Sequence, residues 1–312
     1  MSNTFEYVSI FQQELDKAAV ATATSGWMEL NDKLIKYNGG ADVKIPSITM
    51  DGLADYDRQE GYTDGAVNLK YETKTMTQDR GRRFTLDAMD VNESNFVATA
   101  SSVMGEFQRT HVVPEIDAYR YSSIAAQAIK ANQAIYGYTP EEATILATLL
   151  DDIAAIQDVV GDGTPLMISM AVKVAAIFDR SEKLSKSLSV VDFKQGDVTM
   201  KVKSIDGQHP IIRVGSARMK TSYLFKDGKT VDQESGGFAP GVDAKDINWI
   251  ICPRTTPIAV SFLYEIIINS TLIIYTDYKH KCRNKRRKGL IISTFCLFIA
   301  DIFFKYVDRV AY

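Results

Sequence analysis

Cysteine is scarce in this chain of 312 residues, and its spacing fits no common chemistry. The three cysteines, Cys252, Cys282 and Cys296, are an odd number and match neither a zinc-binding spacing nor a disulfide framework. Such usage is typical of a protein made in a reducing compartment such as the bacterial cytoplasm. A secretory leader is not expected, because residues 1–16 carry acidic and amide side chains where a basic and then an apolar stretch would be needed.

Histidine is equally scarce, and other catalytic patterns are missing. His111, His209 and His280 lie far apart in the sequence and have no partner at metal-ligand spacing, so we interpret them as surface or helix-capping residues. The adjacent acids at 141–142 and 151–152 are expected to face solvent or a helix N-terminus. The sequence therefore predicts no catalytic, cofactor-binding or metal-binding residue, and a protein that is not an enzyme.

One glycine-rich stretch could suggest a phosphate loop. Residues 161–164 (Gly-Asp-Gly-Thr) lack the Gly-Lys-Ser/Thr ending of such a loop. They also precede an apolar strand, whereas a phosphate loop opens a helix. We interpret them as a turn.

The composition is that of an ordinary globular protein, but the charge is distributed unevenly. Hydrophobic residues make up 46% and charged residues 24% of the chain. Residues 262–312 hold nine Lys or Arg and four Asp or Glu, a net charge of +5. Since the whole chain carries −3, residues 1–261 carry −3 − 5 = −8. An acidic body of this kind is not expected to bind DNA tightly, because DNA-binding surfaces present an excess of Lys and Arg.

The apolar pattern predicts a mixed α+β fold that begins with an arm and a loop. Residues 1–40 show helical spacing near the start and again over 27–37, and we expect a helical N-terminal arm. Residues 41–90 change to the alternation of strands around a polar loop at 51–64. A two-stranded projection with so little apolar surface is not stable alone, so it must lie on something else.

A long helix and a second α+β region follow. Residues 91–136 carry a continuous apolar stripe, which we expect to break or kink at Pro114. From residue 137 to 255 we expect a helix capped by Thr139, then a short strand, a helix capped by Ser169, and several strands.

The segment Arg80-Gly81-Arg82-Arg83-Phe84 is basic with an aromatic residue, a composition that can contact nucleic acid. It is flanked by Asp79 and Asp87 and lies in the acidic part of the chain. We therefore favour inter-subunit salt bridges or a solvated strand for Arg80, Arg82 and Arg83.

Several segments resemble, in order and spacing, the major capsid proteins of one group of tailed bacteriophages. The similar segments are residues 74–94, the stretch 107–120 (Phe-Gln-Arg-Thr-His-Val-Val-Pro-Glu-Ile-Asp-Ala-Tyr-Arg), residues 204–212 with Ile205-Asp206-Gly207, and residues 237–251 with 257–260. The resemblance covers about residues 1–261.

This resemblance implies the Hong Kong 97-like capsid fold, an α+β fold with peripheral and axial domains. The implied parts are an N-terminal arm (1–40), an extended β loop (41–90), a spine helix of the peripheral domain (91–136), an axial domain (137–255) and a return strand (256–261). It also implies a shell protein of a phage or prophage that assembles in the bacterial cytoplasm into hexamers and pentamers of an icosahedral virion capsid. Scaffold, portal and protease proteins would be its partners, and DNA would be enclosed with weak contact.

Three further residues are candidate inter-subunit contacts. Lys70 and Lys74 lie in the extended loop, which in this family lies across the neighbouring subunit. Phe238 lies in the glycine-rich stretch 236–241, which we interpret as a contact loop or a plain connection. An encapsulin-like nanocompartment subunit of the same fold remains the alternative function.

Residues 262–312 do not resemble the family's ending. They contain a basic run at 281–288 followed by the nearly apolar stretch 290–304. Our hypothesis is that the reading frame shifts near codon 261–262, or that the gene belongs to a decayed prophage. The alternative is a C-terminal membrane anchor, although 15 residues containing Asp301 are short of the ~20 that a spanning helix needs. We expect no membrane contact.

Overall fold

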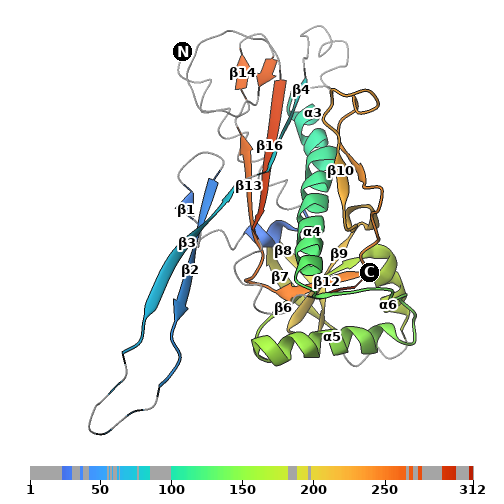
Figure 1. The fold of residues 1–312 in the computed structure, drawn as a ribbon. Helices are drawn as coiled ribbons and strands as arrows, with labels where there is room; N and C mark the ends of the chain where they lie inside the picture. The colour runs from blue at the N-terminus through green and yellow to red at the C-terminus, as the bar shows by residue number, and fades with distance from the viewer. Residues whose placement is uncertain are drawn as a thin grey trace.

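The protein is described by a computed structural model and has a mixed α+β fold (Figure 1). The residues that the structure describes are 23–29, 36–37, 42–54, 56, 58, 62, 64–75, 77–84, 100–181, 188–195, 198–264, 267–269, 273–275, 290–299 and 309–311. The α+β class predicted from the sequence is confirmed.

A seven-stranded sheet forms the centre of the body, in the order β5-β17-β12-β6-β9-β8-β7. Its strands are β5 (Ala134–Ile135), β6 (Leu166–Ala171), β7 (Leu188–Gln195), β8 (Val198–Ile205), β9 (His209–Val214), β12 (Trp249–Pro253) and β17 (Arg309–Ala311). Every residue of β6 and β12 is buried, as is expected of strands covered on both faces.

Helices cover both faces of this sheet. Helices α5 (Ile145–Val160) and α6 (Val172–Arg180) lie on one face, where the indole Nε1 of Trp249 donates a hydrogen bond to Asp152 of α5 at 3.0 Å. The long helix reaches the sheet from the other side (Figure 1). One continuous apolar core, which includes Tyr121 and Ile124 from that helix, joins the layers.

The long helix consists of three consecutive parts: α3 (Ala100–Phe107), the π-helical turn η2 (Gln108–Val112) and α4 (Val113–Lys130). Pro114 lies in the first turn of α4, directly after the π-helical turn, so the chain is helical on both sides of it. Of the expected break or kink at Pro114, the break is wrong, because residues 100–130 are helical without interruption. The wider turn just before it lets the helix continue past the proline ring.

A hairpin of β2 (Asp42–Met50) and β3 (Val67–Thr75) projects away from the body, and the short strand β1 (Lys36–Tyr37) pairs with β2 at its root. Strands β2 and β3 pair antiparallel along their full length, from Asp42 opposite Thr75 to Met50 opposite Val67. Figure 1 shows that the distal part of this hairpin touches no other described element.

Smaller sheets lie beside the upper part of the long helix. Strand β16 (Leu290–Ile299) pairs with β4 (Gln78–Phe84) on one side and with β13 (Ile258–Tyr264) on the other. Two short hairpins are formed by β10 (Tyr223–Phe225) with β11 (Phe238–Pro240), and by β14 (Ile267–Asn269) with β15 (Ile273–Tyr275). Among the described strands, residues 262–312 therefore contribute to three sheets: through the end of β13 and β16, through β14 and β15, and through β17.

Three local predictions are wrong. Helix α5 begins at Ile145 after an N-cap at Thr144, whereas Thr139 lies in the loop before it. Strand β6 runs through Ser169 to Ala171, so Ser169 caps nothing and α6 starts at Val172. Of the amphipathic stretch 27–37, residues 26–29 form a single 3₁₀ turn and residues 36–37 a strand. The helix expected over residues 5–19 lies outside the described residues.

In the part of the chain that the structure describes, no helix is long and apolar enough to cross a membrane. Residues 290–299 of the segment considered as an anchor form strand β16.

Candidate interaction surfaces

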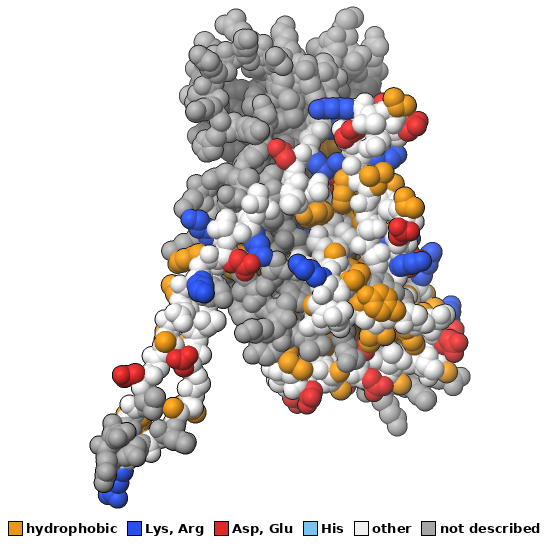
Figure 2. All heavy atoms as spheres, in the orientation of Figure 1, with side chains coloured by type: hydrophobic (Ala, Val, Ile, Leu, Met, Phe, Trp, Pro, Cys, Tyr) orange, Lys and Arg blue, Asp and Glu red, His pale blue; other side chains and the backbone are white. Residues whose placement is uncertain are grey.

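The distal hairpin exposes an apolar stripe, which we define as Ile48, Met50, Val67, Leu69 and Tyr71. The strand register places Ile48 opposite Leu69 and Met50 opposite Val67, so these side chains share one face of the hairpin. Met50 is 71% and Leu69 55% exposed. Figure 2 shows this arm standing clear of the body. Neighbouring apolar side chains that are exposed together in this way are typical of a surface that binds a partner.

The opposite face of the hairpin is buried only near its root. Val43 and Ile45, which alternate with Ile48 and Met50 along β2, are 0% and 1% exposed. The hairpin is therefore fastened to the molecule by one face at its root, and it presents the other face farther out.

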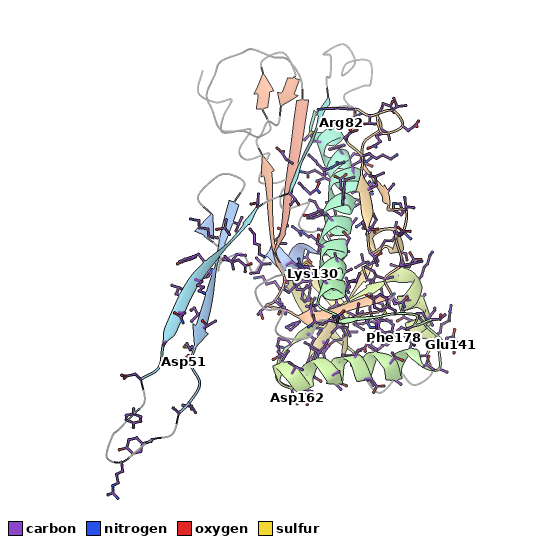
Figure 3. All side chains as sticks on the ribbon, in the orientation of Figure 1. Asp51, Arg82, Lys130, Glu141, Asp162 and Phe178 are labelled. Carbon is purple, nitrogen blue, oxygen red and sulfur yellow. The ribbon has the colours of Figure 1, made fainter. Side chains whose placement is uncertain are left out.

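The loop that ends the hairpin carries aromatic side chains. The rings of Tyr56 and Tyr62 lie 4.9 Å apart, and both side chains are exposed. The two strands are closed by Asp51, whose N–H donates to the carbonyl of Ala66 at 3.2 Å and whose carboxylate accepts from the N–H of Ala66 at 2.8 Å. Figure 3 labels Asp51 at this distal end.

The two lysines predicted as contacts lie on the face of β3 opposite the apolar stripe. Lys70 is exposed, and the ammonium of Lys74 lies 2.7 Å from the carboxylate of Glu72 on the same strand. A contact of either lysine with another subunit stays a prediction.

Arg80 and Arg82 make contacts within their own chain. The guanidinium of Arg80 donates from Nε to the carboxylate of Glu115 on α4, and from Nη2 to the carbonyl oxygens of Lys226 (2.9 Å) and Gly237 (3.1 Å). Arg82 donates from both Nη atoms to the carbonyl of Glu234 at 3.2 Å. Arg83 belongs to the same strand, β4. An inter-subunit role for these arginines stays a prediction.

Phe238 lies in an aromatic cluster on the β10–β11 hairpin. Its ring centroid is 5.4 Å from that of Tyr223 and 6.5 Å from that of Phe225. An open groove of about 620 Å³ lies beside this hairpin, lined by residues 77–82, by one side of the long helix (Phe107, His111, Val112, Glu115, Ile116 and Tyr119), and by residues 225–229 and 235–237. Phe238 itself is partly exposed, and its contact role is untested.

A buried polar cluster ties residues 23–29 to the body, and sequence reasoning missed it. The carboxylate of Asp117 accepts hydrogen bonds from the N–H and hydroxyl groups of both Thr24 and Ser25, at 2.5–3.1 Å, and pairs with Arg218 at 3.0 Å. The neighbouring Arg120 donates to Ser25 and to Glu29. Asp117 and Arg120 are fully buried. In the sequence, an acidic and a basic residue three positions apart on an otherwise apolar helix face were the signal that could have predicted this cluster.

His209 is a core residue, so its interpretation as a surface or capping residue is wrong. It is 3% exposed, and its Nδ1 accepts a hydrogen bond from the N–H of Leu166 at 3.2 Å. Its Nε2 lies 3.3 Å from the amide nitrogen of Gln157 on α5. Burial lowers the pKa of His209 below its ordinary value, and the carboxylates of Asp206 and Asp162 oppose this shift only in part. The interpretation of His111 as a surface residue is confirmed, because His111 is exposed in the π-helical turn. His280 lies outside the described residues.

The described residues contain no group of three or more His, Cys, Asp or Glu side chains placed to hold a metal ion. The stretch 161–164 is a turn, with Gly161 in a left-handed conformation (φ +100°), as predicted.

Comparison with known proteins gives similarity to solved structures only. No protein-family model matches the chain, and no curated protein matches it. A virus-like particle from Pyrococcus furiosus is 10% identical and has a TM-score of 0.47, with 96% of this chain and 98% of that chain covered. A cyanophage A-1(L) capsid asymmetric unit gives 11% identity, a TM-score of 0.49, and 94% and 92% coverage. The mature capsid of bacteriophage PhiM1 gives 12%, 0.47, and 88% and 82%. At these values the likeness alone does not establish a family or a function.

Proposed function

We propose that this chain is the major capsid protein of a tailed bacteriophage or prophage, with the Hong Kong 97-like fold. Its copies associate into hexamers and pentamers that close into an icosahedral shell around DNA. Residues 41–90 are the extended loop, residues 91–136 the spine helix, and residues 137–255 the axial domain. The proposed role of the protein is structural and not catalytic.

The exposed apolar stripe of the hairpin is the observation that carries this proposal. A two-stranded hairpin is marginally stable in water, and this one leaves its distal apolar side chains uncovered within its own chain. A second copy of the chain is the natural cover, because a projecting element that docks on the next subunit makes a heterologous contact. Repeating one such contact around an axis closes a ring, so each contact can be modest.

The remaining partners follow from the same proposal. Scaffold, portal and protease proteins of the phage would act with the shell protein in the bacterial cytoplasm, and the virion is its final location. The enclosed DNA would be held weakly, because residues 1–261 carry a net charge of −8 by the count above.

Electron microscopy of the purified full-length protein tests the proposal. Closed shells are the expected result, and a variant with Leu69→Asp and Ile48→Asp should remain a folded subunit that forms none. A matched variant, Asn68→Asp, changes the opposite face of the same strand at an exposed residue that is not a candidate contact, and it separates loss of the apolar stripe from general damage to the hairpin. Soluble monomers under all assembly conditions, both of the wild-type chain and of a chain whose residues 262–312 are replaced by the ending read from the shifted frame, would refute the proposal.

The contents of the shells distinguish a phage capsid from an encapsulin-like nanocompartment. A phage capsid is followed by packaging of DNA, whereas a nanocompartment encloses a protein cargo. Isolation of particles from the bacterial host, followed by nuclease-protected DNA measurement and identification of co-purified proteins, decides between them.

For residues 262–312 we propose a shifted reading frame near codon 261–262. The support is the change in net charge and composition at that point and the loss of family resemblance beyond it. Translation of the other two frames of the downstream DNA tests this proposal. If neither frame encodes an ending similar to that of the family, the proposal is wrong, and β16 and β17 belong to the native chain.

A further inference from the structure

We infer that Arg80 is a positioning residue that sets the direction in which the β2–β3 hairpin leaves the body. This inference rests on the proposed function for its biological meaning, because there the hairpin is the element that reaches the next subunit. The geometry itself is a property of the single chain.

The first observation is that Arg80 joins three elements that are distant in sequence. Its guanidinium pairs with Glu115 on the long helix and donates to the carbonyls of Lys226 and Gly237, which bracket the loop between β10 and β11. It also lies over the ring of Phe225, 5.6 Å from the ring centroid. A planar guanidinium with several directed donors fixes orientation in a way that the ammonium of lysine does not.

The second observation is that residues on either side of Arg80 repeat the attachment. Arg82, on the same face of the strand, donates twice to the carbonyl of Glu234, and the hydroxyls of Thr77 and Tyr119 lie 2.7 Å apart. Gly228 and Gly236 approach Arg82 so closely that an added Cβ would lie 3.0 Å and 3.4 Å from its Nη1. Both glycines also have a positive φ, so the loop is shaped around the arginine.

The third observation is the place of this cluster in the chain. Strand β3 ends at Thr75 and β4 begins at Gln78, so the attached residues immediately follow the hairpin. A nine-residue strand spans roughly 30 Å, so a tilt of about 10° at its root displaces the far end by roughly 5 Å. A displacement of that size is enough to misplace an interface whose side chains must interdigitate. Figure 3 shows Arg82 near the upper end of the long helix and Asp51 where the paired strands β2 and β3 end.

These contacts give Arg80 a different role from the inter-subunit salt bridge predicted from the sequence. Its donors are directed at Glu115 and at the loop of its own chain. Loss of Arg80 is therefore expected to change assembly indirectly, by widening the range of hairpin directions. It is also expected to loosen the loop at residues 226–237.

Distance measurements on the unassembled full-length subunit test the inference. Spin labels attached through p-acetylphenylalanine, introduced at Arg58 in the hairpin loop and at Asp151 on α5, report the hairpin direction by pulsed electron resonance. We expect Arg80→Ala to widen the distance distribution roughly twofold, because the hairpin can then take a wider range of directions. Arg80→Lys should restore the narrow wild-type distribution only in part, because an ammonium lacks the directed donors of a guanidinium. Amide hydrogen exchange of residues 226–237 should rise in the same variant.

Matched variants keep the test decisive. Arg109→Ala removes an exposed arginine that pairs with Glu106 on the same helix, and it should leave the distribution unchanged. Should Arg80→Ala fail to fold, Glu115→Gln and Arg82→Ala weaken the same attachment more gently and should each widen the distribution. An unchanged distribution in all folded variants refutes the inference. Because no shell is needed, this result is independent of whether the wild-type chain assembles.

Discussion

Strands β6 and β3 show how differently one chain can use the same kind of segment. All six residues of β6 are buried, whereas every residue of β3 except Lys74 is exposed, although β3 also contains valine, leucine and tyrosine. Strand β6 lies between two strands and beneath helices, while among the described strands β3 pairs with β2 alone. Burial is therefore decided by neighbouring layers and not by composition alone. The body folds around its own core, whereas the hairpin presents an exposed apolar surface that, under the proposed function, a second copy of the chain covers.

The sharpest test of this comparison is the same substitution in the two regions, beginning with the body. Leu149 on α5 is fully buried in the main core. We expect Leu149→Ala to lower the free energy of unfolding by about 2–5 kcal/mol, because it removes buried methyl groups and leaves a cavity. Urea unfolding followed by circular dichroism measures this loss. A loss below about 1 kcal/mol would mean that the core is not close-packed at this position.

The second largest effect is expected at the polar cluster that holds residues 23–29. Asp117→Asn removes the buried negative charge opposite Arg218, and we expect a loss of about 3 kcal/mol, as for other broken buried pairs. Asp179→Asn is the matched control, because Asp179 pairs with Lys203 and Arg213 at the surface, where we expect less than about 1 kcal/mol. Equal losses in the two variants would show that burial of Asp117 does not matter.

A smaller, pH-dependent effect is expected from His209. Because its pKa is lowered in the folded protein, the unfolded chain binds more protons as the pH falls below the ordinary value of about 6.5. The stabilising contribution of neutral His209 is thus complete above that pH and is lost progressively below it. Urea unfolding from pH 8 to pH 5 measures this trend. In His209→Gln the decline between pH 6.5 and pH 5 should be shallower than in the wild type, and identical slopes would contradict the assignment.

The smallest effect on subunit stability is expected in the hairpin. Leu69→Ala should change the free energy of unfolding by less than about 0.5 kcal/mol, because the side chain is largely exposed in the single chain. The same variant should nevertheless reduce the yield of shells, because it removes part of the apolar stripe. Unfolding and light scattering on one preparation measure the two effects. A loss of stability as large as that of Leu149→Ala would remove the distinction between hairpin and body.

The sequence determined the main elements because their signals are local. The alternation along residues 67–75 predicted β3, and the apolar stripe before and after Pro114 predicted the long helix. The helix starts were predicted less well. A capping box at Thr139 is a local preference worth about 1 kcal/mol, and packing of the apolar face of α5 begins only at Ile145.

Tertiary structure alone decided which polar residues are buried and what the arginines contact. Asp117 and Ser25 are 92 positions apart in sequence, and Arg80 and Gly237 are 157 apart, so no periodicity could connect them. The sequence led us to interpret His209 as a surface or capping residue, yet folding placed it against Leu166 and Gln157 in the core. The physical reason is that periodicity reports one face of one element, whereas the partners of a polar group are set by which elements pack together.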